Sequence, residues 1–533
     1  MKELLWRIEL EDGREFTGRE EWKEGTVSVR RELPTGVLRA VSAEVSLPVP
    51  DGDKVFINGF QSWTACPEYG SEDRIRSLRH LPKAGVKYFG LDRYGDYYFV
   101  DYPDRKGLVH GESWMYFRRG EEYELIASLD EEPGYTLFRY DRRGGKLTIE
   151  RDCAGLRCGG EFRALELFLA RGGEDEVFDA WFAAMGVRPR TLEPIAGYSS
   201  WYNRYENINE ECILSDLKGC EKHLRPGDLF QIDDGWEPGV GDWLEPDPVK
   251  FPNGMKPSVE AIHGAGFKAG LWLAPFVARK KSIVFEEHPD WLLRVDGKPW
   301  YCGVNWGGFY SLDIDHPEVR EYLAKVFRRV FDEWGFDLVK LDFLYGAAPV
   351  GTAEESRAGR MIRAMDFLRE LCGDKLILGC GVPMMPAFGR VEYCRIGCDV
   401  GLDWDGSWLM QQTHRERVST RQSIGNTVFR RQLNRRAFLN DPDVFFLRTE
   451  NLKLTEKQKK ALSVINTLLG DVMLTSDDMN KYTPDQAKRY AALRRLKNAE
   501  DIRLDFSDGV AVSYTLDGKR STLQILPGEK RKK

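Results

Sequence analysis

From about residue 195 onward the sequence repeats one pattern: a short apolar run, a loop and an amphipathic helical segment. Apolar runs of four to eight residues bounded by turn residues are typical of buried strands, and their alternation with helices favours a parallel sheet. Eight such units over about 300 residues predict a (β/α)8 barrel spanning residues 191–498. A doubly wound open sheet is the alternative that the pattern leaves open.

The clearest helix is predicted over residues 316–335. Its apolar side chains recur every three or four residues, which is the spacing of one helix face, and Gly335 provides the stop. These side chains are Val319, Tyr322, Leu323, Val326, Val330 and Phe331.

Residues 1–190 follow a different rhythm. Apolar and polar residues alternate over short runs such as 53–60 and 95–103, with turn residues between them, which predicts an N-terminal β-sandwich. A helix over 175–186 and a linker with two prolines close this region. Alternation returns over residues 499–533 and predicts a short C-terminal β-appendage of about three strands. The expected fold is therefore multidomain.

Composition excludes several classes of function. The net charge of -7 includes no basic stripe, so we expect no nucleic-acid partner. Neither a membrane-length apolar run nor a signal-peptide core is found, so we expect no membrane association and a cytoplasmic location. The ten cysteines form no CxxC pair and the seven histidines do not cluster, so we expect reduced thiols, no metal and no cofactor.

Polar residues stand where several predicted strands end. The catalytic groups of a (β/α)8 barrel lie at the carboxyl ends of its strands. A single strand-end aspartate commonly caps a helix or holds a turn, but the recurrence here favours a functional site. The residues are Asp233, Asp234, Lys340, Asp342, Arg395, Asp399, Asp441, Asp443, Asp477 and Asp478.

Two of these strands carry a cation and a carboxylate on one face. Strand alternation predicts that Lys340 and Asp342 point the same way, and that Arg395 and Asp399 share a face across Gly397. Each pair could be a structural ion pair. Two separated carboxylates with nearby cations also suit glycoside hydrolysis, in which one carboxylate attacks and the other carries a proton. Lys340 favours ionised Asp342, whereas Arg395 opposes a protonated Asp399 unless the guanidinium is engaged elsewhere.

Several ordered motifs resemble the α-galactosidases of glycoside hydrolase family 36, in the clan shared with family 27, and in particular the shorter prokaryotic members. The resemblance runs through nearly the whole predicted barrel and reaches residues 57–63 of the β-region. The motifs are "FQIDDGWEPGVGDW", "AGLWLAPF", "EEHPDWLL", "VKLDFLYG", "LGCGVPMMPAFG", "RIGCDVG", "LNDPDVFFLR" and "INGFQSW".

The resemblance implies a role for each matching residue. Asp342 matches the family's nucleophile and Asp399 its acid/base. Other matching residues would bind the sugar: Asp233 and Asp234 the O4 and O6 hydroxyls, Lys340 and Arg395 further hydroxyls, Trp201 and Trp272 as pocket walls, Cys380 beside the pocket, and Trp63 donated by the β-sandwich. Without the resemblance, core packing is the better interpretation of each tryptophan.

The resulting hypothesis is a retaining exo-α-galactosidase whose partner is a small α-galactoside sugar. Related glycosidases or transglycosylases of the α-N-acetylgalactosaminidase or raffinose-synthase type are alternatives, with changes expected near Cys380 and Gly381. A non-catalytic sugar-binding protein on the same scaffold is a third hypothesis, and the presence of both Asp342 and Asp399 speaks against it. A homo-oligomer is left open.

Overall fold

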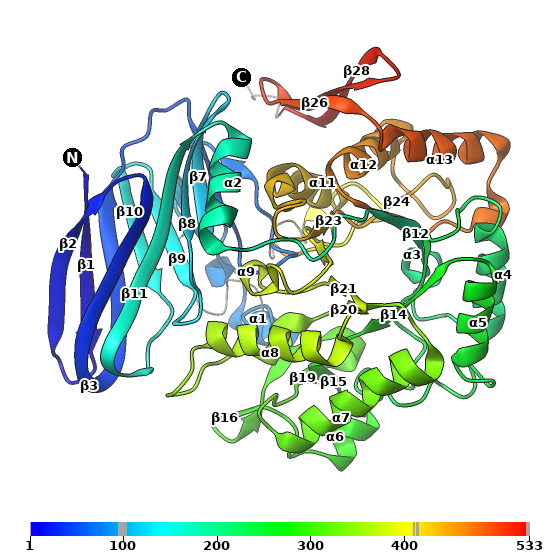
Figure 1. The fold of residues 1–533 in the computed structure, drawn as a ribbon, viewed down its shortest axis with the longest axis horizontal. Coiled ribbons are helices and arrows are strands. Elements are labelled where there is room, and N and C mark those ends of the chain that lie inside the picture. Colours follow the sequence, from blue (N-terminus) through cyan, green and yellow to red (C-terminus); the bar gives the residue numbers. More distant parts are fainter. Residues whose placement is uncertain (1, 94–103, 409–410, 412–414, 529–533) are drawn as a thin grey trace.

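A computed structural model describes the chain except for residues 1, 94–103, 409–410, 412–414 and 529–533. Figure 1 shows an antiparallel β region, coloured blue to cyan, beside a region in which helices surround strands, coloured green to orange. A small red sheet follows at the C-terminus. The structure therefore confirms the expectation of a multidomain protein.

The first region is an antiparallel sheet of eleven strands. The sequence predicts two packed sheets, but the pairing joins all the strands through β3, whose first half pairs with β11 and whose second half pairs with β1 and β10. Pro34 lies near the changeover, where a residue without an N–H weakens a single ladder. The strands are β1 (Lys2–Leu10), β2 (Glu15–Trp22), β3 (Gly25–Ser46), β4 (Lys54–Ile57), β5 (Glu68–Tyr69), β6 (Leu108–Glu112), β7 (Trp114–Arg119), β8 (Glu122–Ser128), β9 (Thr136–Asp141), β10 (Lys146–Arg151) and β11 (Arg157–Gly172).

The second region is built on a parallel sheet in the order β23-β22-β21-β20-β14-β13-β12-β25-β24. Its two end strands, β23 and β24, are separated only by Pro442 and Asp443, so the order begins and ends in two pieces of one interrupted strand. The strands are β12 (Ile195–Ser199), β13 (Leu229–Ile232), β14 (Lys268–Leu273), β20 (Leu338–Leu341), β21 (Leu376–Gly379), β22 (Tyr393–Arg395), β23 (Leu439–Asp441), β24 (Val444–Phe445) and β25 (Val472–Thr475).

Helices follow most of these strands and cover the outside of the sheet (Figure 1). The predicted amphipathic helix forms α7 and continues as a wider turn of helix over Arg329–Trp334, where Gly335 ends it in the left-handed conformation. All six residues of its predicted apolar face are buried. The longer helices are α2 (Glu174–Met185), α4 (Glu210–Cys220), α5 (Lys256–Gly264), α7 (Pro317–Arg328), α8 (Arg357–Cys372), α11 (Thr420–Phe429), α12 (Glu456–Leu469) and α13 (Pro484–Leu496).

A small insertion separates β14 from β20. It consists of β15 (Val277–Arg279), α6 (Ile283–Glu287), the hairpin β16 (Arg294–Val295) and β17 (Lys298–Pro299), then β18 (Tyr301–Gly303) and β19 (Phe309–Ser311). Sequence reasoning did not find these short strands, because two- and three-residue strands carry no readable alternation. The insertion supplies one side of the pocket described below.

The C-terminal sheet has three antiparallel strands, β26 (Glu500–Asp505), β27 (Gly509–Leu516) and β28 (Lys519–Pro527), as the sequence predicts. Phe506 stacks on Phe429 at the end of α11, with 5.9 Å between the ring centroids, which ties this sheet to the parallel region. The domain boundaries proposed from the sequence remain predictions. The strand expected over residues 95–103 lies outside the described residues.

An aromatic cluster joins the antiparallel and parallel regions. Trp114 of β7 and Trp181 of α2 both contact Phe388, with ring centroids 6.1 and 6.0 Å away, and all three side chains are buried. Such burial fixes the two regions against each other. No helix among the described residues has the length and apolar character needed to cross a membrane.

Candidate active site

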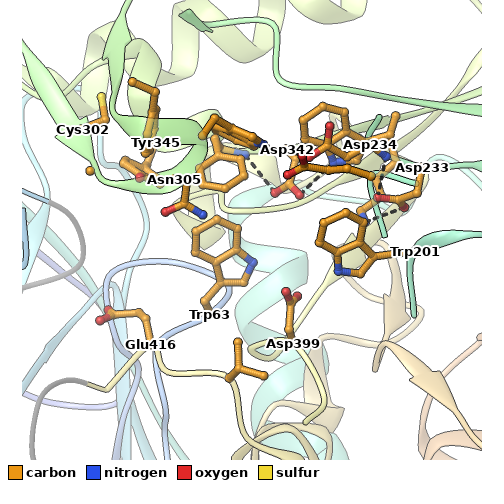
Figure 2. Close-up of a pocket in the computed structure, with 18 of the residues that line it drawn as sticks. Trp63, Trp201, Asp233, Asp234, Cys302, Asn305, Asp342, Tyr345, Asp399 and Glu416 are labelled. Carbon is orange, nitrogen blue, oxygen red and sulfur yellow. Dashed lines mark hydrogen bonds and ion pairs between the residues drawn. The ribbon is translucent and has the colours of Figure 1, made fainter. Parts of the chain in front are cut away.

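A pocket of about 410 Å³ opens at the carboxyl ends of the parallel strands. Figure 2 shows Asp342 and Asp399 facing this space from different sides, with Trp63 and Trp201 beside it. The lining combines carboxylates, one lysine and several aromatic rings, which are the groups that bind sugar hydroxyls and sugar C–H faces.

Lys340 and Asp233 form a buried ion pair on the floor of the pocket. The Lys340 ammonium lies 2.9 Å from Asp233 Oδ2, which also accepts from the Gln231 amide at 2.7 Å and the Ser199 hydroxyl at 3.2 Å. Burial alone would lower the pKa of Lys340, but the nearby Asp233 and Asp342 carboxylates raise it above its ordinary value. Lys340 is therefore a fixed positive charge on the floor.

Asp342 follows directly after β20, and both of its carboxylate oxygens accept hydrogen bonds. Trp272 Nε1 donates to Oδ2 at 3.1 Å, and the backbone N–H of Phe343 donates to Oδ1 at 2.9 Å. Phe343 has φ 52° and ψ 32°, so the chain turns sharply through the left-handed region at this point. The turn aims Asp342 into the pocket. Burial raises the pKa of Asp342, while Lys340 acts in the opposite direction.

Asp399 lies at the rim rather than on the floor. Its side chain is 37% exposed, whereas that of its partner Arg395 is 2% exposed. Arg395 Nη2 lies 2.8 Å from Asp399 Oδ1 and 3.3 Å from Asp443 Oδ2, so one guanidinium serves two carboxylates. Asp443 also accepts from the Tyr202 hydroxyl at 2.6 Å. Because Arg395 also pairs with Asp443, its charge does not act on Asp399 alone. This weakens the argument that Arg395 would prevent Asp399 from carrying a proton.

Asp234 lies beside Asp233 on the floor of the pocket and belongs to a second carboxyl pair. Trp306 Nε1 donates to Asp234 Oδ2 at 2.9 Å. Burial raises the pKa of Asp234 to about 6, and a hydrogen bond from Glu237 acts in the opposite direction. Burial and the Asp234 charge raise the pKa of Glu237 well above its ordinary value. Of the two, Glu237 therefore holds a proton more readily, and it donates a hydrogen bond to the Asp234 carboxylate.

Trp63 reaches the pocket from the antiparallel region. Its Nε1 donates to Cys380 Sγ at 3.3 Å, and its ring lies edge-on to Phe343 with 5.0 Å between centroids. Gly381 leaves room for the indole, because a Cβ there would lie 2.9 Å from Trp63 Cζ2. Trp63 is therefore half-buried between two regions of the chain and presents the rest of its ring to the cavity.

Comparison with protein families and curated proteins points in one direction. The family model described as Melibiase matches residues 191–365. An α-galactosidase of Escherichia coli is 30% identical over 184 residues, which cover 32% of this chain and 25% of that protein. The α-galactosidase Mel36A of Lactobacillus acidophilus is 29% identical over 27% of this chain and 20% of its own length. The aligned segment thus spans about a quarter of these relatives.

Solved structures match nearly the whole chain. The α-galactosidase TtGalA of Thermus thermophilus, in complex with p-nitrophenyl α-D-galactopyranoside, has a TM-score of 0.75 at 28% identity, covering 97% of this chain and 98% of that chain. The GH36 α-galactosidase AgaA of Geobacillus stearothermophilus shares the fold, with a TM-score of 0.61 at 15% identity over 96% of this chain and 79% of its own. In sequence and in fold, the chain resembles the α-galactosidases of glycoside hydrolase family 36.

The structure brings the residues predicted from the sequence together. Eight of the ten line the pocket: Trp63, Trp201, Asp233, Asp234, Trp272, Lys340, Asp342 and Asp399. The other two, Arg395 and Cys380, are buried directly behind Asp399 and Trp63. Their roles remain predictions.

Two details of the sequence interpretation need correction. The direct partner of Lys340 is Asp233 rather than its strand neighbour Asp342, and burial outweighs Lys340 in setting the pKa of Asp342. Furthermore, β22 ends at Arg395, so Gly397 and Asp399 lie beyond the strand. The predicted contact between Arg395 and Asp399 nevertheless forms, because the chain turns back after the strand.

Sequence reasoning missed a group of residues that belong to the pocket. Trp306 and Asn305 come from the insertion after β14, and Glu206, Phe343, Tyr345, Glu416 and Arg417 also contribute to the lining. Trp306 stands in a run with three glycines, and loops held by a rigid scaffold often carry functional residues, so the sequence offered a signal at this position. Glu237 offered no such signal in the sequence, because its hydrogen bond to Asp234 depends on how the loop folds.

Proposed function

We propose that this protein is a retaining exo-α-galactosidase that removes terminal α-galactosyl residues from oligosaccharides, and that its parallel sheet is a (β/α)8 barrel. The observation that carries the proposal is the placement of Asp342 and Asp399 around one pocket, one buried on the floor and the other part-exposed at the rim. A nucleophile and an acid/base need these two environments.

In the first step Asp342 attacks the anomeric carbon as the bond to the leaving oxygen breaks. The hydrogen bonds from Trp272 and Phe343 hold both carboxylate oxygens in place, so attack requires no reorientation of the side chain. The product is a covalent galactosyl-enzyme, and the leaving alcohol takes a proton from Asp399.

In the second step Asp399 acts in reverse. Its carboxylate takes a proton from a water molecule, whose oxygen attacks the anomeric carbon and releases Asp342 and galactose. The position of Asp399 at the rim supports this role, because both the leaving group and the incoming water must pass it. Arg395 holds the carboxylate at a fixed angle from behind.

The floor of the pocket would select galactose. Asp233, Asp234 and Lys340 are buried. Lys340 is hydrogen-bonded to Asp233, and Asp234 accepts from Trp306, so these side chains would be rigid donors and acceptors for the O4 and O6 hydroxyls. An equatorial O4 would leave one of these groups unpaired, and buried unpaired groups discriminate strongly. The Thermus thermophilus relative, solved with p-nitrophenyl α-D-galactopyranoside and with stachyose, supports α-galactosides as the substrate class.

A substrate panel tests the proposal. We expect hydrolysis of p-nitrophenyl α-galactoside and of raffinose-type oligosaccharides, and little hydrolysis of the α-glucoside or the N-acetyl-α-galactosaminide. The Asp342→Ala variant should lose activity, and azide should restore turnover and give β-galactosyl azide. Wild-type rates from Asp342→Ala, or an α-azide product, would contradict the assignment.

A further inference from the structure

The segment that carries Trp63 is a loop of the antiparallel region, residues 58–66, which joins β4 to β5. Its backbone is bonded to the parallel region along its length. The N–H of Ser62 donates to the Val382 carbonyl at 2.9 Å, and the N–H of Cys66 donates to the side chain of Asn426 at 2.9 Å. The loop is therefore shaped by residues from outside its own sheet.

The densest of these contacts come from Arg430, which follows α11 and is fully buried. Its Nε and Nη2 donate to Asn58 Oδ1 at 3.0 and 2.8 Å. Nη1 donates to the Ser62 carbonyl at 2.7 Å and to the Ile396 carbonyl at 3.0 Å, and Nη2 also donates to the Gln61 carbonyl at 3.1 Å. One guanidinium thus binds both ends of the turn that precedes Trp63.

These acceptors are all neutral oxygens. Placing a charged guanidinium among buried neutral acceptors costs desolvation energy, so an apolar side chain would fill this position at a lower cost than Arg430. What a guanidinium offers is five N–H donors in a rigid planar fork, which can fix several carbonyls at once. A lysine ammonium could reach only part of this set.

The bond from Arg430 to Ile396 also links the loop to β22. Ile396 follows Arg395, the last residue of β22 and the partner of Asp399, so Arg430 fixes the Trp63 loop relative to the end of this strand. A shift of the loop would move Trp63 away from Phe343 and Gly381, which form its seat.

We propose that Arg430 is a positioning residue that locks loop 58–66 onto the parallel region and so sets Trp63 as a wall of the sugar pocket. Arg430 does not touch the substrate and acts through Trp63. The inference rests on the proposed function for its kinetic readout, but not for its structural one.

A double-mutant cycle tests the inference. The variants are Arg430→Met, Trp63→Ala and their combination, and kcat/KM for p-nitrophenyl α-galactoside is measured for each. Misplacing a pocket wall should lower kcat/KM by about 10- to 100-fold, mainly through KM. In the Trp63→Ala background the Arg430→Met change should cost less than about twofold more, because the group through which Arg430 acts is already absent.

Arg431→Met is the matched control. Arg431 is the next residue in the chain and also bridges to the antiparallel region, through Tyr123 at 3.1 Å and Glu174 at 2.6 Å, but it does not contact loop 58–66. It should lose thermal stability as Arg430→Met does, while keeping KM within about twofold of wild type. Equal effects of the two variants on KM, or additive losses in the cycle, would overturn the proposal.

A second readout is independent of catalysis. The difference in fluorescence emission between each protein and its Trp63→Phe partner reports the surroundings of Trp63 alone, and this emission should shift to the red in Arg430→Met and stay unchanged in Arg431→Met. If the wild type has no galactosidase activity, the proposed function fails while this test of Arg430 still stands. Should Arg430→Met not fold, Asn58→Ala removes two of the bonds and should give the same shift in a smaller degree; an unchanged emission would overturn the proposal.

Discussion

The floor and the rim of the pocket differ in how their charged groups are held. On the floor, Asp233, Lys340 and Asp342 are buried. Lys340 donates a hydrogen bond to Asp233, and Trp272 donates one to Asp342, so the positions of these groups are fixed before a ligand binds. At the rim, Asp399 is more than a third exposed and Val418 about half exposed. Under the proposed function, we expect from this contrast that the floor recognises one sugar with strict geometry, whereas the rim admits leaving groups of varied size.

The largest expected effect comes from removing the proposed nucleophile on the floor. Asp342→Ala should lower kcat by at least about 10⁴-fold, because we propose that this carboxylate forms the covalent intermediate. The loss should be similar for p-nitrophenyl α-galactoside and for raffinose, since the missing step does not depend on the leaving group. Steady-state rates on the two substrates check this, and a loss confined to raffinose would contradict the assignment of Asp342 to the floor chemistry.

Removing the rim carboxylate should instead give a loss that depends on the leaving group. Asp399→Ala should lower kcat/KM for raffinose by about 10²- to 10⁴-fold, because a sugar alkoxide needs a proton to depart. Nitrophenolate leaves without one, so kcat/KM for the aryl galactoside should fall much less. A series of aryl galactosides of increasing leaving-group pKa measures the slope, and equal losses along the series would break the distinction between floor and rim.

A smaller effect is expected at Asp234, which also lies on the floor. Its pKa of about 6 predicts that kcat/KM falls as the pH drops through 6, since the protonated carboxyl no longer accepts from sugar hydroxyls as a carboxylate does. The hydrogen bond from Glu237 stabilises the ionised form of Asp234. Glu237→Leu should therefore move this acid limb to higher pH, and Glu237→Gln, which keeps a donor, should leave it in place.

The pH profile of kcat/KM for the two variants decides the matter. Identical profiles for Glu237→Leu and wild type would show that another group sets the acid limb. Asp342 is the other candidate on the floor, because burial raises its pKa as well.

Much of this architecture can be predicted from the sequence, and the exceptions have physical reasons. The strand–helix alternation and the face of α7 depend on local periodicity, so they are readable residue by residue. That Asp342 and Asp399 lie near each other can be predicted from their places after the ends of strands. That Lys340 pairs with Asp233 cannot be predicted in this way, because Asp233 lies 107 residues earlier. The choice between Asp233 and Asp342 depends on the twist of neighbouring strands.

The insertion after β14 and the role of Arg430 lie further beyond sequence reasoning. Short strands such as β18 carry no periodicity, and the side chains that Trp306 and Arg430 contact are fixed only by the tertiary fold. An arginine after a helix is usually a solvated end or a dipole partner. Only the structure shows that this one is fully buried among carbonyl oxygens.

Glu131 offers a reference for the buried carboxylates of the floor, because it is equally buried but lies away from the pocket, in the antiparallel region. Burial raises its pKa to about 7, against the Arg151 charge 3.9 Å away. Folded Glu131 therefore binds its proton more tightly than the unfolded chain does. Folding takes up a proton between the ordinary glutamate pKa and about 7, so the free energy of unfolding falls as the pH rises through that window.

Glu131→Gln should remove this dependence, with a gain of up to about 3 kcal/mol at pH 8 relative to pH 5 and no change in kcat/KM. Denaturant unfolding at the two pH values measures the effect, and Glu132→Gln, at an exposed neighbouring position, is the control that should not change the slope. A pH dependence that persists in Glu131→Gln would show that other buried carboxyls whose pKa is raised, such as Asp342, Asp234 and Asp441, set it. In that case the burial that raises the pKa of these groups would also be what destabilises the protein in alkali.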